Sequence, residues 1–132
     1  MKLNDALIEL SKNPLIVSGS YKYQNRIELS GLIVRKPKFI KHDKTGIESC
    51  SFILQIINNV NGEIKLETFS CMTFVRDLVE QLKNQEKVIF VSCIGKLMYS
   101  PKVHGNYTQI TYIETLCEFD MELAPEWGKD KE

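Results

Sequence analysis

Positive charge and aromatic rings are interleaved between residues 35 and 44 of this chain. The segment has five lysines and arginines against a single carboxylate, Asp43, and it also contains Phe39 and His42. Cationic side chains follow the phosphates of a nucleic acid, and exposed rings stack on its unpaired bases. The alternative is a solvated loop whose charges serve only solubility. The candidate contacts of this segment are Arg35, Lys36, Lys38, Phe39, Lys41 and Lys44.

Other aromatic side chains stand where a base could stack on them. Phe69 shares a face of its predicted strand with Lys65 and Glu67, which indicates that its ring is exposed. Closer to the C-terminus, a predicted hairpin carries rings and a cation on or beside its loop. These candidates are Tyr99, Lys102 and Tyr107. The alternative for Tyr107 is a half-buried strand position.

Motifs of catalysis, cofactor binding and metal binding are missing from the sequence. It has no G-x-S-x-G, no glycine-rich phosphate loop and no H-E-x-x-H, and its two histidines fall in predicted loops. The four cysteines are at least 21 positions apart and lie in or beside apolar stretches, which favours small buried thiols over metal ligands. They are Cys50, Cys71, Cys93 and Cys117. We therefore expect no enzyme activity, no cofactor and no metal.

The net charge of zero hides an uneven distribution. The 132 residues carry 17 Lys and Arg and 17 Asp and Glu, but residues 1–110 have a net charge of +5 and residues 111–132 a net charge of −5. A basic body fits a nucleic-acid partner, and the acidic end could occupy the same site. The length corresponds to one domain, without a signal peptide or an apolar run of about 18 residues that would cross a membrane. We expect a soluble, cytoplasmic protein with no membrane partner.

Alternating hydrophobicity predicts five strands. Asn61 and Gly62 form a hairpin turn between the second and the third strand. Gly31 and Gly95 lie inside the first and the fourth strand, where a small barrel has to bend its sheet. The predicted strands span residues 25–34, 47–57, 63–72, 87–99 and 107–119, with a predicted loop at 35–46.

Two amphipathic helices complete the pattern. One spans Leu3 to Lys12, and the other follows the third strand with Thr73 as its N-cap. The apolar stripe of the second helix consists of Phe74, Val75, Leu78, Val79 and Leu82. The order of elements predicts a mainly all-β fold, a five-stranded OB-fold barrel with one helix between strands 3 and 4 and an extra N-terminal helix.

The predicted domain organisation has three parts. Residues 1–24 form the N-terminal helix and a connector, and residues 25–119 form the OB-fold domain. Residues 120–132 form a short acidic C-terminal tail, which we expect to be frayed.

Four segments between residues 25 and 119 follow the pattern of a known family. They are NRIELSGLIVRKP, HDKTGIESCSFILQI, ETFSCMTFVRDLVEQL, and the pair KVIFVSCIGKLMYS and HGNYTQITYIETL. In this order they resemble the bacterial-type single-stranded DNA-binding proteins. The internal glycines, the aromatic before the helix and the Gly-x-Tyr that enters the last strand carry the resemblance, and four matches in the right order argue against coincidence.

The resemblance implies an OB fold that assembles as a dimer or tetramer and binds single-stranded DNA in replication, recombination and repair. Phe69 and Phe74 match positions at which the family has stacking aromatics, although Phe74 also fits the core side of the predicted helix. The N-terminal helix and the lack of a long tail with an acidic tip depart from the family pattern, as expected of a plasmid, phage or primosomal relative. Partner proteins of replication or recombination are implied only by the resemblance.

Our prediction is a non-enzymatic OB-fold homo-oligomer that binds and protects single-stranded DNA with little sequence preference. One alternative is an interaction module of a replication or DNA-transfer complex with weak DNA affinity, which the short tail, the extra helix and the lack of tryptophan in the predicted strands favour. Another alternative is single-stranded RNA as the ligand, because nothing in the sequence marks a contact to a 2′-hydroxyl.

Overall fold

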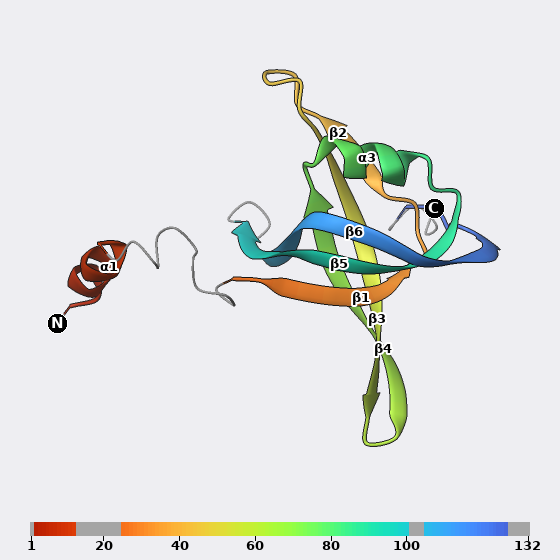
Figure 1. Ribbon diagram of the computed structural model, residues 1–132, viewed down its shortest axis with the longest axis horizontal. Helices are drawn as coiled ribbons and strands as arrows, with labels where there is room; N and C mark the ends of the chain where they lie inside the picture. The colour runs from red at the N-terminus through yellow and green to blue at the C-terminus, as the bar shows by residue number, and fades with distance from the viewer. Residues whose placement is uncertain (1, 13–24, 101–104, 127–132) are drawn as a thin grey trace.

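In the computed structural model, one curled sheet of six strands dominates the described residues, which are 2–12, 25–100 and 105–126 (Figure 1). The strands are β1 (Ile27–Ile33), β2 (Lys38–Lys41), β3 (Glu48–Val60), β4 (Glu63–Thr73), β5 (Lys87–Ser100) and β6 (Gly105–Glu122), and the helices are α1 (Leu3–Ser11) and α3 (Arg76–Lys83). The strand order is β1-β5-β6-β4-β3-β2, and β1 also pairs with β3, which closes the sheet into a barrel. The predicted OB-fold barrel is confirmed.

Gly31 allows β1 to approach β3 closely while β1 pairs with β5. β1 pairs with β5 along its whole length and meets β3 where Leu32 stands opposite Gln55. A Cβ atom at Gly31 would lie 2.5 Å from the carbonyl oxygen of Gln55. The barrel therefore closes at a position where a side chain of any size would collide with the backbone.

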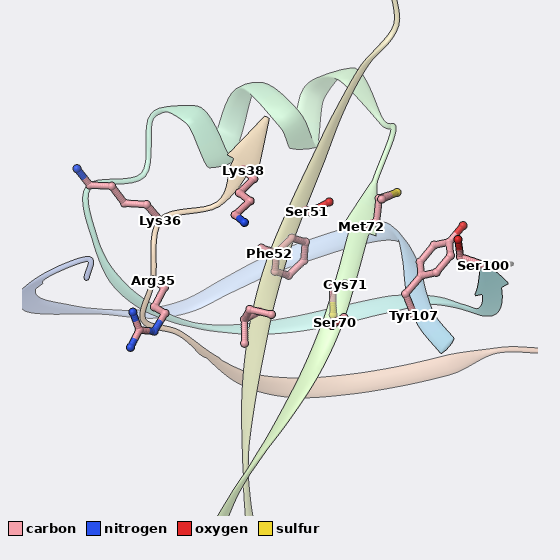
Figure 2. A pocket seen from close by; sticks show the side chains of 11 residues that line it. Arg35, Lys36, Lys38, Ser51, Phe52, Ser70, Cys71, Met72, Ser100 and Tyr107 are labelled. Carbon is pink, nitrogen blue, oxygen red and sulfur yellow. The ribbon is translucent and has the colours of Figure 1, made fainter. Parts of the chain in front are cut away.

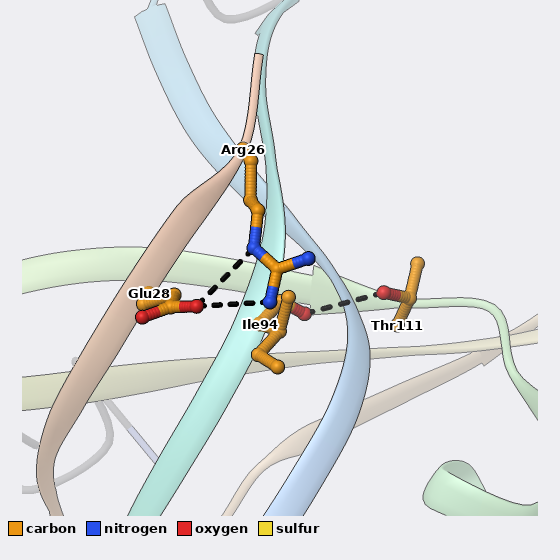
Figure 3. Close-up of polar contacts among 4 residues, drawn as sticks. All are labelled: Arg26, Glu28, Ile94 and Thr111. Atoms are coloured by element: carbon orange, nitrogen blue, oxygen red, sulfur yellow. Dashed lines mark hydrogen bonds and ion pairs between the residues drawn. The ribbon is translucent and has the colours of Figure 1, made fainter. Parts of the chain in front are cut away.

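A second glycine lies at the irregularity predicted in the long β5–β6 pair. The register shifts between Ile94 and Gly95, and Thr111 is the extra residue on β6. The Thr111 hydroxyl donates a hydrogen bond to the Ile94 carbonyl oxygen at 3.3 Å (Figure 3). A Cβ atom at Gly95 would collide with the carbonyl oxygen of Gln109. This bulge bends the sheet as the sequence predicts.

The core consists of the inward-facing side chains of the strands and the buried face of α3. Its buried apolar residues are Ile33, Cys50, Phe52, Leu54, Cys71, Leu78, Val79, Leu82, Val88, Ile89, Val91, Cys93, Ile110, Ile113 and Leu123. Burial raises the pKa of the Cys50, Cys71 and Cys93 thiols to about 12, so these thiols stay protonated near neutral pH. The prediction of a buried thiol is wrong for Cys117, which is exposed on β6.

The segment predicted as a loop between residues 35 and 46 contains a short strand. β2 pairs with the start of β3, and Phe39 stands opposite Cys50 and packs against the core. Gly46 adopts a φ of +71° in the turn between the two strands, and its N–H donates to the His42 carbonyl oxygen at 2.7 Å. The strand forms because pairing with β3 satisfies the backbone of β2, a long-range effect that its four residues do not reveal.

α3 begins later than the sequence predicts. Its N-cap is Val75, and no side chain caps the helix. Thr73 is the last residue of β4, and its buried hydroxyl donates to the Ile110 carbonyl oxygen at 2.8 Å and accepts from the Val75 N–H at 3.2 Å. The predicted cap is therefore wrong, because Thr73 ties β4 to β6 instead. Phe74 and Val75 are exposed, and the buried stripe consists of Leu78, Val79 and Leu82.

The residues after Asp120 are ordered up to Glu126, contrary to the frayed tail predicted from the sequence. β6 continues to Glu122, Leu123 is buried in the core, and Ala124 forms a bridge with Arg35. The remaining predicted tail, 127–132, and the predicted connector, 13–24, lie outside the described residues.

The predicted N-terminal helix is confirmed as α1, which exposes the apolar side chains of Leu3, Leu7 and Ile8. Within the described part of the chain, no helix combines the length and the apolar character that spanning a membrane requires.

Candidate nucleic-acid interface

A groove of about 360 Å³ crosses the outer surface of β3 and β4. In Figure 2 the cationic side chains lie on one side of the two strands, and Tyr107 and Ser100 lie on the other. The groove is lined by Arg35, Lys36, Lys38, Ser51, Phe52, Ile53, Ser70, Cys71, Met72, Ser100 and Tyr107. It therefore joins the β1–β2 segment to the β5–β6 hairpin across the middle of the barrel.

The cationic wall comes from the segment that leads from β1 into β2. Arg35 and Lys36 follow the end of β1, and Lys38 is the first residue of β2. Lys38 pairs with Ser51, whose side chain also lines the groove, and residues paired in this way project from the same face of a sheet. Strand pairing thus holds Lys38 along one side of the groove, and Arg35 and Lys36 lie beside it in the connection from β1 to β2.

The opposite wall is built by the end of the β5–β6 hairpin. Tyr107 is half-buried, pairs with Met98 and contributes its ring to the groove. Ser100 pairs with Gly105 and lies on the same face. The predicted aromatic contact at Tyr107 and the predicted cations Arg35, Lys36 and Lys38 are therefore brought to one groove.

The floor of the groove contains residues that the sequence analysis missed. Ser51 pairs with Met72 and Ile53 pairs with Ser70, and these four side chains form the outer face of β3 and β4. The alternation that assigns Phe52 to the core also assigns its neighbours to the outside. That signal could have found them, but a search for cations and aromatics passes over small polar and aliphatic residues.

Phe69 lies on the other face of β4. It pairs with Leu54, which is fully buried, so its ring is on the face that becomes the barrel interior farther along the strand. The ring is 36% exposed because the β3–β4 hairpin extends beyond the barrel (Figure 1). Phe69 does share a face with Lys65 and Glu67, as predicted, but this face is opposite the groove.

Several other predicted contacts also lie outside the groove. Phe39 packs against the core, with the Lys83 ammonium 5.8 Å from its ring centroid. Tyr99 is exposed next to the Met98 to Tyr107 pair and therefore projects from the opposite face of the hairpin. Lys44 is exposed in the turn between β2 and β3. Lys102 lies outside the described residues.

Lys41 and Phe74 line a separate cleft of about 590 Å³ between the β2–β3 turn and the start of α3. Lys83 in this cleft forms a hydrogen-bonded ion pair with Glu48 and lies 3.8 Å from a carboxylate oxygen of Glu80. The bond to Glu48 raises the pKa of Lys83. Because carboxylates offset its cations, this cleft attracts an anionic strand less than the groove on β3 and β4 does.

Comparison with known proteins adds a fold relationship to this geometry. No protein-family model matches the sequence, and no curated protein is similar to it at the level of sequence. Among solved structures, PriB from Ralstonia solanacearum is similar over 70% of this chain and 98% of its own, with a TM-score of 0.57 and 14% identity.

Two further solved structures extend this relationship. The single-stranded DNA-binding protein of Thermus aquaticus has a TM-score of 0.59 and 17% identity over 71% of this chain and 41% of its own. The Plasmodium falciparum protein of the same kind, solved in complex with single-stranded DNA, has a TM-score of 0.56 and 17% identity over 73% of this chain and 97% of its own.

The chain has the fold of the single-stranded DNA-binding proteins. The resemblance found in the sequence is thus confirmed for the fold. In an OB fold of this kind, oligonucleotides bind to the second and third barrel strands between the loops that follow strands 1 and 4. β3 and β4 are those two strands here, and the groove described above occupies that place.

Proposed function

We propose that this OB-fold protein binds single-stranded DNA with little sequence preference in the groove on β3 and β4. The observation that carries the proposal is the arrangement of the groove, with three cations on one wall, a tyrosine on the other and a floor of serine, isoleucine and methionine side chains between them (Figure 2). This combination suits a strand that exposes both its phosphates and its bases.

Each wall has a chemical task in this proposal. Arg35, Lys36 and Lys38 pair with successive phosphates, and the counterions released from the strand favour binding at low salt. Tyr107 stacks on a base, while Ile53 and Met72 offer apolar contact to its neighbours. A duplex keeps its bases stacked on one another, so it cannot use the tyrosine, and the groove selects unpaired strands.

We propose a binding role without catalysis, in which the protein covers and protects strands exposed during replication, recombination or repair. Hydroxyl, thioether and aliphatic side chains between the two walls suit contact rather than bond-making. A cytoplasmic setting is supported by the buried free thiols, which a reducing compartment preserves.

Assembly into a dimer or tetramer is part of the proposal. Described residues of β5 and β6 expose Leu97, Tyr99, Tyr112, Leu116, Phe119 and Met121. These side chains do not share one face, because Leu97 pairs with the buried Thr108 whereas Tyr112 pairs with Ile94 on the outer side. Exposed apolar side chains in such number are typical of strands that another subunit covers. Light scattering of the purified chain tests this, and a mass equal to one chain at all concentrations would contradict it.

Fluorescence titration with single-stranded DNA, duplex DNA and single-stranded RNA of matched length, at two salt concentrations, tests the function. We expect tight binding to the single DNA strand that weakens with salt, and much weaker binding to the duplex. A preference for RNA would change the proposed ligand. Absence of binding at low salt would contradict the proposal and would favour the alternative of an interaction module.

A further inference from the structure

The residues that follow β6 are tied to the beginning of the cationic wall. The Ala124 N–H donates to the Val34 carbonyl oxygen at 2.8 Å, and the Lys36 N–H donates to the Ala124 carbonyl oxygen at 2.8 Å. Together these bonds form a parallel bridge between Ala124 and Arg35. Residues 123–125, which we name the C-terminal strap, thus lie against the segment from which the cations project.

Both ends of the C-terminal strap are anchored. The Leu123 side chain is buried in the core, and its N–H donates to the Glu86 carbonyl oxygen at 3.2 Å. At the other end, the Pro125 carbonyl oxygen accepts a hydrogen bond from Nη1 of Arg35 at 3.3 Å. In Figure 2 the described end of the chain curls back beside Arg35.

We propose that the C-terminal strap positions Arg35 and Lys36 for phosphate binding in the groove. The strap touches the backbone at Val34 and Lys36 and the side chain of Arg35, so it restrains the connection between β1 and β2. A connection held in place before binding loses less conformational entropy when the strand binds. The inference rests on the proposed function, and it assigns Leu123 and Ala124 as positioning residues that act through the cations.

A competing role for this region predicts the opposite effect. Glu122 and Glu126 flank the C-terminal strap and line a neighbouring cleft together with Lys36. If these carboxylates mainly competed with phosphate for Lys36, loosening the region would raise the affinity for DNA. The two roles therefore differ in the sign of one measurable change.

The experiment compares the full chain with its Ala124→Pro variant in titrations with single-stranded DNA across a series of salt concentrations. Proline at position 124 removes the N–H that donates to the Val34 carbonyl oxygen, and it leaves the Leu123 side chain unchanged. We expect binding to weaken about tenfold, the loss expected for about one charge-assisted hydrogen bond. The slope of log affinity against log salt should fall by about 0.7 for each phosphate that the variant no longer neutralises.

A double-mutant cycle with Arg35→Gln separates positioning from general damage. If the C-terminal strap acts through Arg35, the Arg35→Gln change weakens binding in the wild-type background and has a much smaller effect in the Ala124→Pro background. Pro125→Ala is the matched control, because it keeps the carbonyl oxygen that accepts from Arg35. Circular dichroism and thermal unfolding show whether each variant is folded.

Ala124→Gly replaces the proline variant if that variant does not fold. Glycine retains both hydrogen bonds and adds only backbone freedom, so a smaller loss of the same sign is expected. Equal or tighter binding by a folded strap variant, with an unchanged salt slope, would overturn the positioning role. No binding by the wild-type chain would instead contradict the proposed function, and the two failures are distinguishable.

Discussion

Tyr107 is the residue that the proposal assigns to stacking on a base. The sequence predicts five aromatic residues that bind DNA, and the structure describes all five. Tyr107 is the one among them that lines the groove together with the cations. Phe69 lies on the opposite face of β4, and Tyr99 on the opposite face of the hairpin. The groove therefore predicts different consequences for rings that the sequence treats as equivalent.

Replacement of Tyr107 by alanine tests this difference. We expect a loss of about 1–3 kcal/mol in binding to single-stranded DNA, because one base loses its stacking partner. The Tyr107→Phe variant retains the ring and is expected to bind nearly as well as the wild type. Phe69→Ala should weaken binding less than Tyr107→Ala does, and the reverse order in fluorescence titrations would place the strand on the other face of β4.

Lys38 and Lys44 form a matched pair for testing the cationic wall. Lys38 lines the groove, whereas Lys44 lies in the turn between β2 and β3. Lys38→Gln should lower the salt slope of single-strand binding by about 0.7, the value for one neutralised phosphate. Lys44→Gln should leave the slope unchanged. Equal slopes for the two variants would show that the charge of the whole segment, rather than the groove, attracts the strand.

The reactivity of the four cysteines with a thiol reagent tests which of them are buried in the core. Cys50, Cys71 and Cys93 are buried with pKa values raised to about 12, and Cys117 is exposed. Ellman's reagent should therefore modify one thiol quickly in the native protein and all four in denaturant. Fast modification of two or more native thiols would contradict the described core.

The same thiols give stability a pH dependence with a definite sign. Burial raises each folded-state pKa from 9.0 to about 12, so the unfolded chain loses these protons first. The stabilisation is fully present below about pH 9 and declines as the pH rises between 9 and 12. Urea unfolding at a series of alkaline pH values should show this decline, and stability that is constant across the range would exclude it.

Among the elements, β5 depends on a glycine. A Cβ atom at Gly95 would collide with the backbone of β6, so Gly95→Ala should force the two strands apart. We expect the free energy of unfolding to fall by about 1–3 kcal/mol, as for other overpacked positions. Ser92→Ala on the same strand is the control, and urea unfolding measures both. An unchanged stability for Gly95→Ala would indicate that the β5–β6 bulge can move.

Strand alternation explains why most of the barrel is predictable from the sequence. The long strands β3 to β6 carry a clear period of two, and Gly31 and Gly95 mark the places where the sheet bends. β2 was missed because its four residues begin and end with lysine, and only the open edge of β3 makes them a strand. The start of α3 was missed because the Thr73 hydroxyl is taken by the distant Ile110.

At the scale of the whole molecule, the groove depends on contacts that local patterns do not contain. The cationic wall was predictable because its residues lie within four positions of one another in the sequence, whereas its distance from Tyr107 depends on closure of the barrel. The bridge between Ala124 and Arg35 joins residues from opposite ends of the barrel sequence. The sequence predicts a frayed end because the C-terminal residues are acidic, and it does not reveal that Leu123 is buried in the core.

The fold places the basic and the acidic residues of the chain at different positions around the groove. Cations from the basic part of the chain line the groove, and the first acidic residues of the C-terminal part either belong to β6 or lie beside the C-terminal strap. A truncation after Asp120 would remove Leu123 from the core together with the acidic charge, so substitution of single carboxylates is the better test of their effect. Net charge alone does not reveal this arrangement.

Photo-crosslinking of the wild-type protein to a single-stranded oligonucleotide that contains iodouracil, with the linked peptides mapped by mass spectrometry, tests the central claim most directly. The groove account predicts crosslinks at Tyr107 and at floor residues such as Met72, which increase at low salt and are competed by unlabelled single strands. Crosslinks confined to Phe69 or Tyr99, or none at low salt, would contradict it.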